Sequence, residues 1–333
     1  MKHKQLGRSS LHVPVVSFGA FAIGGWYWGG TDDKRAIAAL HAALDAGMNA
    51  IDTAPIYGFG HSERVVGKAL ADRRADALIM TKVGLRWDTD EGVEFFPTAG
   101  PDGKKTMVRR NAKPESIRTE VDQSLERLGV ETLDLVQVHW PDPSTPIAET
   151  MGALAELRSA GKLREIGVSN YTPEMMQEAQ DALGDVPLAS NQPKYSLVAR
   201  EIEADVLPWA REHQVGLVVY SPLDQGLLTG KVRADRTFPP GDGRGKRPSF
   251  RAENRARVNA VLDDVVLPIA ESKQASIAQT VLAWTAAQEG ISSLLVGARD
   301  ENQALENARA GEIELAAEEL SAIADAFSQL ELV

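Results

Sequence analysis

The sequence predicts an α/β protein folded as a single (β/α)8 barrel, and three observations lead to that prediction. Short apolar runs alternate with amphipathic stretches eight times along the 333 residues. The runs are mostly Val, Ile, Leu and Ala without polar alternation, which is typical of parallel strands buried on both faces. No Pro/Ser-rich linker divides the chain, so we expect one domain over 1–333. An open doubly wound sheet is the alternative.

The predicted elements begin with a hairpin and continue strand by strand. Residues 3–12 are expected to turn around Gly7-Arg8-Ser9-Ser10 and to plug the barrel floor. The apolar runs interpreted as strands are 13–18, 48–52, 78–82, 133–138, 164–168, 188–191, 216–220 and 293–296. Since parallel strands need long crossovers, a helix is expected after most of them.

Four of the helices have clear start and stop signals. The first, 32–46, has Asp32 and Asp33 in its first turn and stops at Gly47. The second, 114–128, begins at Pro114 and stops at Gly129. Similar patterns predict helices over 146–160 and 173–183. Two connections, 83–113 and 221–255, exceed the usual length, and long loops on a rigid scaffold often carry function.

The composition excludes several classes of protein. With 36 Lys and Arg against 47 Asp and Glu, the formal charge is −11, whereas general nucleic-acid binders are normally basic. There is no Cys, so disulfides, thiolate nucleophiles and Cys-bound metals are excluded. The six His form no HxH or HExxH pair, so we expect no metal site.

Three segments resemble known motifs without satisfying them. Residues 13–30 are uncharged after a basic start, but Pro14 and five Gly interrupt them, so we expect no signal peptide, no membrane span and a cytoplasmic protein. Residues 24–31 resemble a phosphate-binding loop, but Gly30 stands where the Lys is needed. The Gly-rich stretch 241–245 follows no strand and is not a Rossmann turn.

Polar residues end three successive predicted strands. Asp52, Lys82 and His139 follow apolar runs, and Tyr57 comes five residues after Asp52. Barrel enzymes build their active sites where the strands end, so we expect the four side chains to meet there. Each has a structural alternative when taken alone: a turn cap, a solvated cation, a hydrogen-bonded core imidazole or a loop aromatic.

In type, order and strand position, these four residues match the Asp-Tyr-Lys-His tetrad of the aldo-keto reductases. Further segments are similar to that family, namely 167–170, 191–193, 220–223, 226–231 and 297–299, with Gln303, Glu306 and Asn307. The chain therefore resembles this family over nearly its whole length. The nearest resemblance is to bacterial reductases and to the potassium-channel β subunits that share the fold.

Carbonyl reduction gives each tetrad residue a role. A phenol with a pKa near ~10 is a slow proton donor at neutral pH, so the Lys82 ammonium is expected to lower the pKa of Tyr57, the general acid. Asp52 would keep Lys82 charged and aimed. His139, neutral, would donate a hydrogen bond to the carbonyl oxygen. Because no side chain supplies a hydride, a cofactor must.

The resemblance implies a nicotinamide dinucleotide. Ser169, Asn170 and Gln192 would bind the carboxamide of the nicotinamide, and Tyr220 would stack on its ring. The full set of cofactor residues implied is Gly19, Ala20, Phe21, Ser169, Asn170, Gln192, Tyr220, Ser221, Pro222, Leu223, Gln225, Gly226, Lys231, Gly297, Arg299, Gln303, Glu306 and Asn307. A plain barrel loop is the structural alternative, since Ser-Asn after a strand is also a common helix start.

Charge favours NADPH as the cofactor. Residues 231–251 hold seven basic and two acidic side chains, a net charge of +5 on an acidic protein, which suits a pyrophosphate, while Arg299 suits a 2′-phosphate. A solvated linker without function is one alternative. A single-stranded nucleic-acid groove using Phe238 and Phe250 is another.

The substrate side departs from the family pattern. Ala20-Phe21 stands where many relatives have Thr-Trp, and Val296 replaces a common Pro. The candidate substrate-binding residues are Trp26, Trp28, Trp87 and Trp140, with loop packing as the alternative. No basic cluster falls in the substrate pocket, so we expect small aldehydes or ketones rather than highly charged sugars.

Three functions remain open at this point. The first is an NADPH-dependent carbonyl reductase. The second is a cofactor-binding regulatory subunit with slow turnover. The third is a barrel enzyme that forms a Schiff base through Lys82. We expect no nucleic-acid or membrane partner, and a monomer or weak homo-oligomer.

Overall fold

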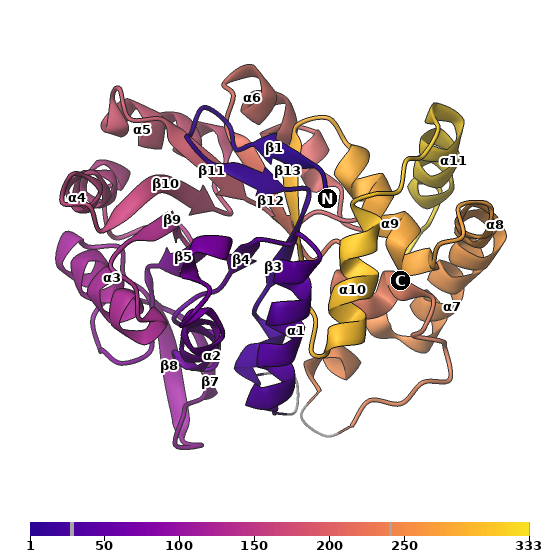
Figure 1. Cartoon of the computed structure of the whole chain (residues 1–333), viewed down its shortest axis with the longest axis horizontal. Helices are drawn as coiled ribbons and strands as arrows, with labels where there is room; N and C mark the ends of the chain where they lie inside the picture. The colour runs from indigo at the N-terminus through magenta and orange to yellow at the C-terminus, as the bar shows by residue number, and fades with distance from the viewer. Residues whose placement is uncertain (27–29, 240–241, 333) are drawn as a thin grey trace.

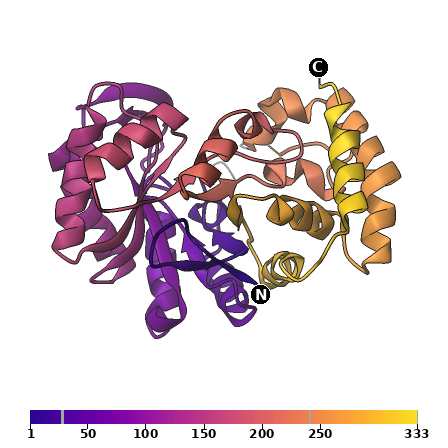
Figure 2. The ribbon, with the colours of Figure 1, turned by 90° about the horizontal axis from the view of Figure 1, so that it is seen from above.

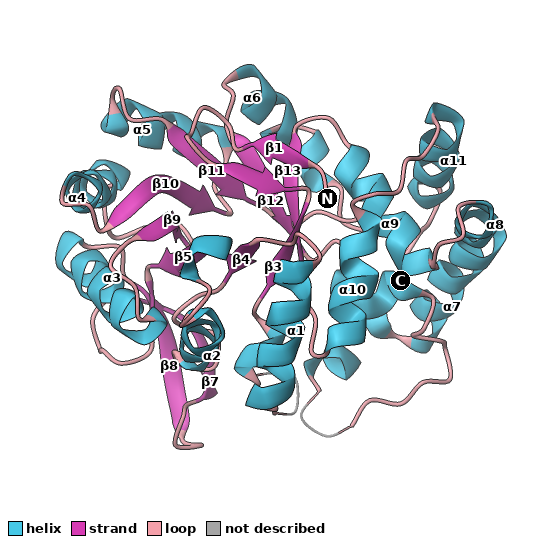
Figure 3. Ribbon diagram, in the orientation of Figure 1, coloured by secondary structure: helices cyan, strands magenta, loops and turns pink. Residues whose placement is uncertain are grey.

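Eight parallel strands close into the predicted barrel in a computed structural model, which describes residues 1–26, 30–239 and 242–332. In chain order the barrel strands are β3 (Val16–Gly19), β4 (Ala50–Asp52), β5 (Leu78–Val83), β9 (Leu133–Val138), β10 (Leu163–Ser169), β11 (Leu188–Gln192), β12 (Gly216–Tyr220) and β13 (Ile291–Val296). The last strand pairs with the first, Leu294 opposite Val16, which closes the ring (Figure 3).

Helices surround this barrel (Figure 1). They are α1 (Asp33–Asp45), α2 (His61–Leu70), α3 (Pro114–Leu128), α4 (Ile147–Ser159), α5 (Pro173–Leu183), α6 (Val206–Glu212), α7 (Ala252–Val261), α8 (Leu267–Ser272), α9 (Ile277–Ala287), α10 (Glu301–Ala310) and α11 (Ala317–Ser328). Figure 2 shows the C-terminal helices, orange to yellow, gathered on one side of the molecule. The four predicted helices are confirmed to within a residue at each end.

Local sequence explains the helix ends. The Asp32 side chain accepts hydrogen bonds from the backbone N–H groups of Lys34 and Arg35, which caps α1. Pro114 occupies the first turn of α3, and Gly129 ends it with a φ of 67°, a left-handed conformation that suits glycine. These signals are local, so they could be recognised in the sequence.

The N-terminal hairpin closes the barrel floor as predicted. Strand β1 (His3–Gln5) pairs antiparallel with β2 (His12–Pro14). Leu6, Leu11 and Val13 pack against side chains of six barrel strands. Gly7 is required here, because its φ is +56° and a Cβ would come within 2.7 Å of the Ala189 carbonyl oxygen.

The predicted strand 13–18 is divided in the structure. Val13 and Pro14 belong to hairpin strand β2, whereas β3 starts at Val16. The two parts bury their side chains in different places: Val13 packs in the floor cluster, and Val16 packs in the main core. The continuous apolar run 13–18 therefore contains the end of one strand and the start of the next.

The long connection after β5 contains a small antiparallel sheet. Its strands are β6 (Leu85–Arg86), β7 (Val93–Ala99) and β8 (Lys105–Arg110), in the order β6-β8-β7. Figure 1 shows β7 and β8 extending away from the barrel. The second long connection, after β12, consists of short 3-10 segments at Asp224–Thr229, Gly243–Lys246 and Pro248–Phe250 before α7 begins.

Candidate active site

The four candidate catalytic residues meet at the carboxyl ends of three adjacent strands. Asp52 is the last residue of β4, Lys82 lies in β5 and His139 directly follows β9. Tyr57 lies in the turn between β4 and α2. Strand β4 pairs with β5, and β5 pairs with β9, so the barrel itself brings these side chains together.

Lys82 is fully buried and ion-paired. Its Nζ lies 2.6 Å from Asp52 Oδ2 and donates a second hydrogen bond, of 3.1 Å, to the Thr53 carbonyl oxygen. Burial acts to lower the pKa of Lys82, but Asp52 and Tyr57 outweigh it, and the pKa is raised overall. A buried ammonium is tolerated only when it is paired in this way, so Lys82 keeps its charge.

Tyr57 is half-buried beside that ammonium. Lys82 Nζ lies 5.0 Å from the centroid of the Tyr57 ring. Burial raises the pKa of Tyr57 and Asp52 adds to the rise, while Lys82 lowers it; the net pKa lies above its usual value of 10.0. Lys82 therefore acts in the expected direction, but the expected net lowering is absent because desolvation of the phenolate is the larger effect.

His139 is neutral. Burial, and then the charge of Lys82, hold the pKa of its imidazole well below the usual 6.5. Its ring lies 5.8 Å from the Tyr57 ring, centroid to centroid, and nearly perpendicular to it. A neutral imidazole keeps one N–H and one acceptor nitrogen, so it can donate a hydrogen bond to a carbonyl oxygen.

Two buried glutamines hold the other oxygen of Asp52. Gln192 Nε2 donates to Asp52 Oδ1 at 2.8 Å and Gln137 Nε2 at 3.4 Å. A carboxylate only accepts, so the Gln192 amide nitrogen must face Asp52. The same nitrogen lies 3.3 Å from Gln137 Oε1. Both N–H groups of the Gln192 side chain are thus used, and its side-chain oxygen Oε1 is the group available to a ligand.

Gln137 was not among the residues predicted from the sequence. It stands in the middle of the apolar strand Leu135-Val136-Gln137-Val138 and is fully buried. A lone amide within such a strand was the available signal, since a buried polar side chain needs partners.

A cavity of about 560 Å³ lies beside the tetrad. Asp52, Tyr57, His139 and Trp140 line it. The candidate cofactor residues also line it, with the exception of Ala20. Ala20 is fully buried in the hydrophobic core. Lys82 lies behind Asp52, away from the lining. Within the described part of the chain, Trp26 and Trp87 do not reach this cavity, and Trp28 lies outside the described residues.

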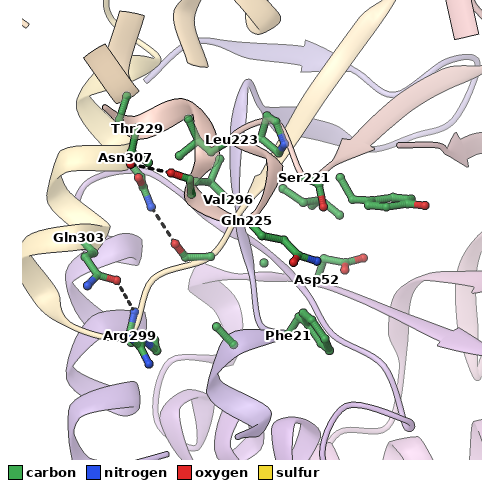
Figure 4. Close-up of a pocket in the computed structure, with 18 of the residues that line it drawn as sticks. Phe21, Asp52, Ser221, Leu223, Gln225, Thr229, Val296, Arg299, Gln303 and Asn307 are labelled. Carbon is green, nitrogen blue, oxygen red and sulfur yellow. Dashed lines mark hydrogen bonds between the residues drawn. The ribbon is translucent and has the colours of Figure 1, made fainter. Parts of the chain in front are cut away.

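The lining changes character along the cavity, which suits a nicotinamide dinucleotide. Figure 4 shows Phe21 and Asp52 towards one side, and Arg299, Gln303 and Asn307 on the other. Lys231, Arg236, Arg244 and Arg299 contribute cations to the lining. Arg236 and Arg244 belong to the basic stretch 231–251, which was expected to suit a pyrophosphate, although neither was among the individual cofactor residues implied. Arginine and lysine suit phosphate groups.

Hydrogen bonds connect the side chains at the end of the cavity next to His139. Tyr220 Oη donates to Asn170 Oδ1 at 3.0 Å, and Asn170 Nδ2 donates to the His139 carbonyl oxygen at 3.1 Å. Ser169 Oγ donates to the Gln192 carbonyl oxygen at 2.7 Å. The side chains expected to bind the carboxamide are thus already held together, and Tyr220 presents an aromatic face that suits a flat ring.

The backbone is strained where it lines the cavity. Ser221, Asp224 and Gln225 have φ values of 59°, 40° and 56°, in the left-handed region that non-glycine residues rarely adopt. Such strain persists only where surrounding contacts fix it, and it is common at ligand sites. Here the Arg244 guanidinium donates to the Gln225 carbonyl oxygen at 3.3 Å.

Neither a metal cluster nor a membrane span emerges from the part of the chain that the structure describes. Across 1–26, 30–239 and 242–332, no three His, Asp or Glu side chains gather closely enough to hold a metal ion. Over the same ranges, every helix is too short or too polar to cross a bilayer.

The chain is similar to known proteins over most of its length. Residues 15–327 match the model of the Aldo/keto reductase family. The NADH-specific methylglyoxal reductase of Escherichia coli is 37% identical over 95% of both chains. A probable voltage-gated potassium channel subunit beta of Oryza sativa is 33% identical over 93% of this chain and 91% of its own.

A solved structure is also similar over almost its full length. The glycerol dehydrogenase of Gluconobacter oxydans superimposes with a TM-score of 0.87 at 39% identity, covering 98% of this chain and 95% of that one.

Proposed function

The chain belongs to the aldo/keto reductase family, and from that membership we propose that it uses NADPH to reduce the carbonyl group of small aldehydes or ketones to an alcohol. The observation that supports this most directly is the buried Lys82–Asp52 ion pair beside Tyr57, with a neutral His139 on the same cavity. Proton transfer to an oxygen needs such an acid within reach.

In this proposal each side chain has one task. His139 donates a hydrogen bond to the carbonyl oxygen and orients it. Tyr57 gives its hydroxyl proton to that oxygen, and Lys82 stabilises the phenolate that remains. Asp52 holds Lys82 in place. A bound reduced nicotinamide supplies the hydride that the carbonyl carbon receives. Hydride and proton together convert the carbonyl to an alcohol.

The finer assignments are part of the same proposal. Residues 1–333 form one functional domain in the cytoplasm, as a monomer or weak homo-oligomer, and the candidate cofactor residues bind the dinucleotide. Trp140 lies on the cavity and supports the proposed substrate wall. NADPH rather than NADH is favoured by Arg299, although a relative is named as NADH-specific.

A second candidate function is a regulatory subunit that binds NADPH and turns over slowly. It is supported by the relatives named as potassium channel β subunits. The Schiff-base alternative fits poorly, because a nucleophilic amine must be uncharged, and the pKa of Lys82 is raised.

Three measurements separate these functions. NADPH oxidation is followed with a panel of aldehydes and ketones, while NADPH affinity is measured by calorimetry. Steady turnover with several carbonyls supports the reductase. Tight NADPH binding with negligible turnover across the panel supports the regulatory subunit. Borohydride trapping of a substrate on Lys82 would instead establish the Schiff-base enzyme.

A further inference from the structure

A buried amide in the barrel interior connects the Lys82–Asp52 ion pair with the proposed cofactor side of the cavity. Gln137, on β9, is fully buried, and its Nε2 donates to Asp52 Oδ1 at 3.4 Å. Its Oε1 accepts from Gln192 Nε2 at 3.3 Å. Gln192 Nε2 itself donates to Asp52 Oδ1 at 2.8 Å. Gln137, Gln192 and Asp52 therefore form a closed triangle of hydrogen bonds.

This triangle crosses the barrel instead of joining paired strands. Asp52 ends β4, Gln137 lies in β9 and Gln192 ends β11. Strand β5 separates β4 from β9, and β10 separates β9 from β11, so the hydrogen bonds must pass through the barrel interior. In the part of the chain that the structure describes, Asp52 and Gln192 line the cavity and Gln137 does not. Gln137 thus lies behind the side chains that a ligand would touch.

A glycine on the strand between β9 and β11 makes room for the amide. In the register of the sheet, Gly167 of β10 lies opposite Gln137 on one side and Ser190 on the other. A Cβ on Gly167 would crowd Gln137 Cγ at 3.0 Å and would collide with Ser190 Oγ. Ser190 Oγ donates to Gln137 Oε1 at 3.5 Å. The fold therefore leaves space for the Gln137 side chain and gives it a further partner.

Donor and acceptor chemistry fixes the orientation of both amides. A carboxylate only accepts, so the Nε2 groups of Gln137 and Gln192 face Asp52. Gln137 then presents its Oε1 to the second N–H of Gln192. Gln192 is left with its own Oε1 available to a ligand N–H at the cavity. If Gln137 were apolar, that second N–H would be buried without its partner, which destabilises this orientation of Gln192.

We propose that Gln137 is a positioning residue that orients two groups at once, the Asp52 carboxylate and the Gln192 amide. The inference rests on the proposed function, in which Gln192 binds the carboxamide of the nicotinamide. In that function Asp52 also holds Lys82, which stabilises the phenolate of Tyr57. A substitution at Gln137 should therefore weaken cofactor binding and proton transfer together, although Gln137 would touch neither the cofactor nor the substrate.

The first variant, Gln137→Leu, removes both polar atoms and keeps a side chain of similar size. We expect the Kd for NADPH to rise about 10-fold, because Gln192 is no longer held in one orientation. We expect kcat for a reactive aldehyde to fall about 10-fold, because Asp52 loses a donor, while KM for the aldehyde changes by less than about threefold. Fluorescence titration measures the Kd, and NADPH oxidation at saturating cofactor gives kcat and KM.

The second variant, Gln137→Glu, makes the same test reversible with pH. A protonated carboxyl can donate to Asp52 and accept from Gln192, as the amide does, whereas an ionised carboxyl can only accept and repels Asp52. Burial raises the pKa of Glu120 in this chain to about 8, so a buried carboxyl can stay protonated near neutral pH. Lys82 is paired with Asp52 Oδ2 and stays charged. We expect Kd and kcat within about threefold of the wild type at about pH 6.5, and losses of about 10-fold in both at about pH 9.

The matched control is Ser17→Ala. It breaks a buried hydrogen bond of the same barrel, 2.6 Å between Ser17 Oγ on β3 and Ser293 Oγ on β13. We expect the control to lower the melting temperature and to keep the wild-type Kd and kcat at both pH values. A residue with a merely structural role should behave in the same way, because it changes stability without changing the constants of the folded protein.

The outcomes distinguish this inference from the proposed function. Wild-type Kd and kcat in Gln137→Leu, a change in only one of the two constants, or equal losses at both pH values in Gln137→Glu would overturn the role of Gln137 and leave the reductase function intact. Failure of both variants to fold would also overturn it, because Gln137 would then serve the fold itself. If no carbonyl is reduced but the Kd for NADPH follows the expected pattern, the orientation of Gln192 by Gln137 is supported and the reductase function alone is overturned.

Discussion

At Tyr57, three influences act on one hydroxyl. Burial and Asp52 raise its pKa, and Lys82 lowers it. An acid with a raised pKa holds its proton tightly in the ground state, so Lys82 matters most at the moment when the phenolate forms. The ion pair with Asp52 ensures that Lys82 is charged at that moment.

Replacing Tyr57 by phenylalanine tests the acid directly. The ring and its contacts with Phe21 and His139 remain, and only the hydroxyl is lost. We expect kcat to fall by about 100-fold or more, with the Kd for NADPH changed by no more than a few-fold. Pre-steady-state measurements with a reactive aldehyde give both values. Near-normal turnover would show that another group supplies the proton.

The pH dependence of reduction follows from two pKa values. Tyr57 must be protonated, and its pKa is raised above 10.0; His139 must be neutral, and its pKa lies well below 6.5. Both groups are therefore in their active form across the neutral range. We expect kcat/KM to be flat between about pH 6.5 and 9 and to decline above that range as Tyr57 ionises. A decline centred near pH 7 would contradict these assignments.

Arg299 tests the choice of cofactor. Its side chain is exposed on the cavity lining, and its backbone N–H bonds to the Gln303 side chain at 3.0 Å. Arg299→Ala should raise the Kd for NADPH by about 10-fold or more and leave that for NADH within about twofold, because only NADPH carries the 2′-phosphate. Fluorescence titration measures both constants. Equal effects would exclude a 2′-phosphate contact.

The four candidate residues Asp52, Tyr57, Lys82 and His139 could be picked out in the sequence, because each ends or directly follows an apolar run or lies in the turn after one. Gln137 was not predictable in the same way, because its role depends on Asp52 and Gln192, which lie on other strands. The net pKa of Tyr57 was also beyond sequence reasoning, since burial is a property of the folded chain.

Helix α3 supports the start of the small antiparallel sheet formed by β6, β7 and β8. The backbone N–H of Gly84, between β5 and β6, donates to the Glu120 carboxyl at 3.0 Å. Arg86 donates to Ser116 Oγ at 3.0 Å, also on α3. Glu120 is buried, and burial raises its pKa to about 8.

Glu120 predicts how stability depends on pH. At pH 7 its folded-state carboxyl is protonated, whereas in the unfolded chain it ionises near 4.5. Its contribution to stability is therefore complete below about pH 4.5 and is lost as the pH rises to about 8. Glu120→Gln removes this loss, so we expect the variant to exceed the wild type in free energy of unfolding by about 1 kcal/mol or more at pH 9. Urea unfolding at pH 5 and 9 measures the difference, which should shrink at pH 5.

The antiparallel pair β7–β8 was not predicted from the sequence, for a physical reason. Strand β7 reads Val-Glu-Phe-Phe-Pro-Thr-Ala, and the bulge at Phe95 interrupts the alternation that would have marked a strand. The barrel strands were predicted because burial on both faces makes them continuously apolar. Sequence patterns therefore revealed the elements with uniform surroundings and missed the irregular one that lies near the candidate catalytic residues.

For the whole molecule, the barrel closes between the two ends of the chain. Strand β13 pairs with β3, and helix α10 packs against α1. Neither half can complete the sheet without the other. The eightfold alternation allowed either an open sheet or a barrel, and the count of eight strands favoured the barrel that the structure shows.

This closure leads to a prediction about unfolding. If residues 1–333 are one domain, scanning calorimetry should show one transition whose calorimetric and van't Hoff enthalpies agree. The Ser17→Ala variant should keep a single peak, shifted in temperature. Two separated peaks in the wild type would show that parts of the chain unfold independently.

The plug formed by Leu6, Leu11 and Val13 has a consequence for the order of events. These apolar side chains fill the floor of the barrel, and the cavity lies at the opposite end, where the strands finish. In the proposed reaction, cofactor and substrate would both enter from that end. The ligand that lies deeper would then have to bind first and leave last, and its release would set a limit on turnover.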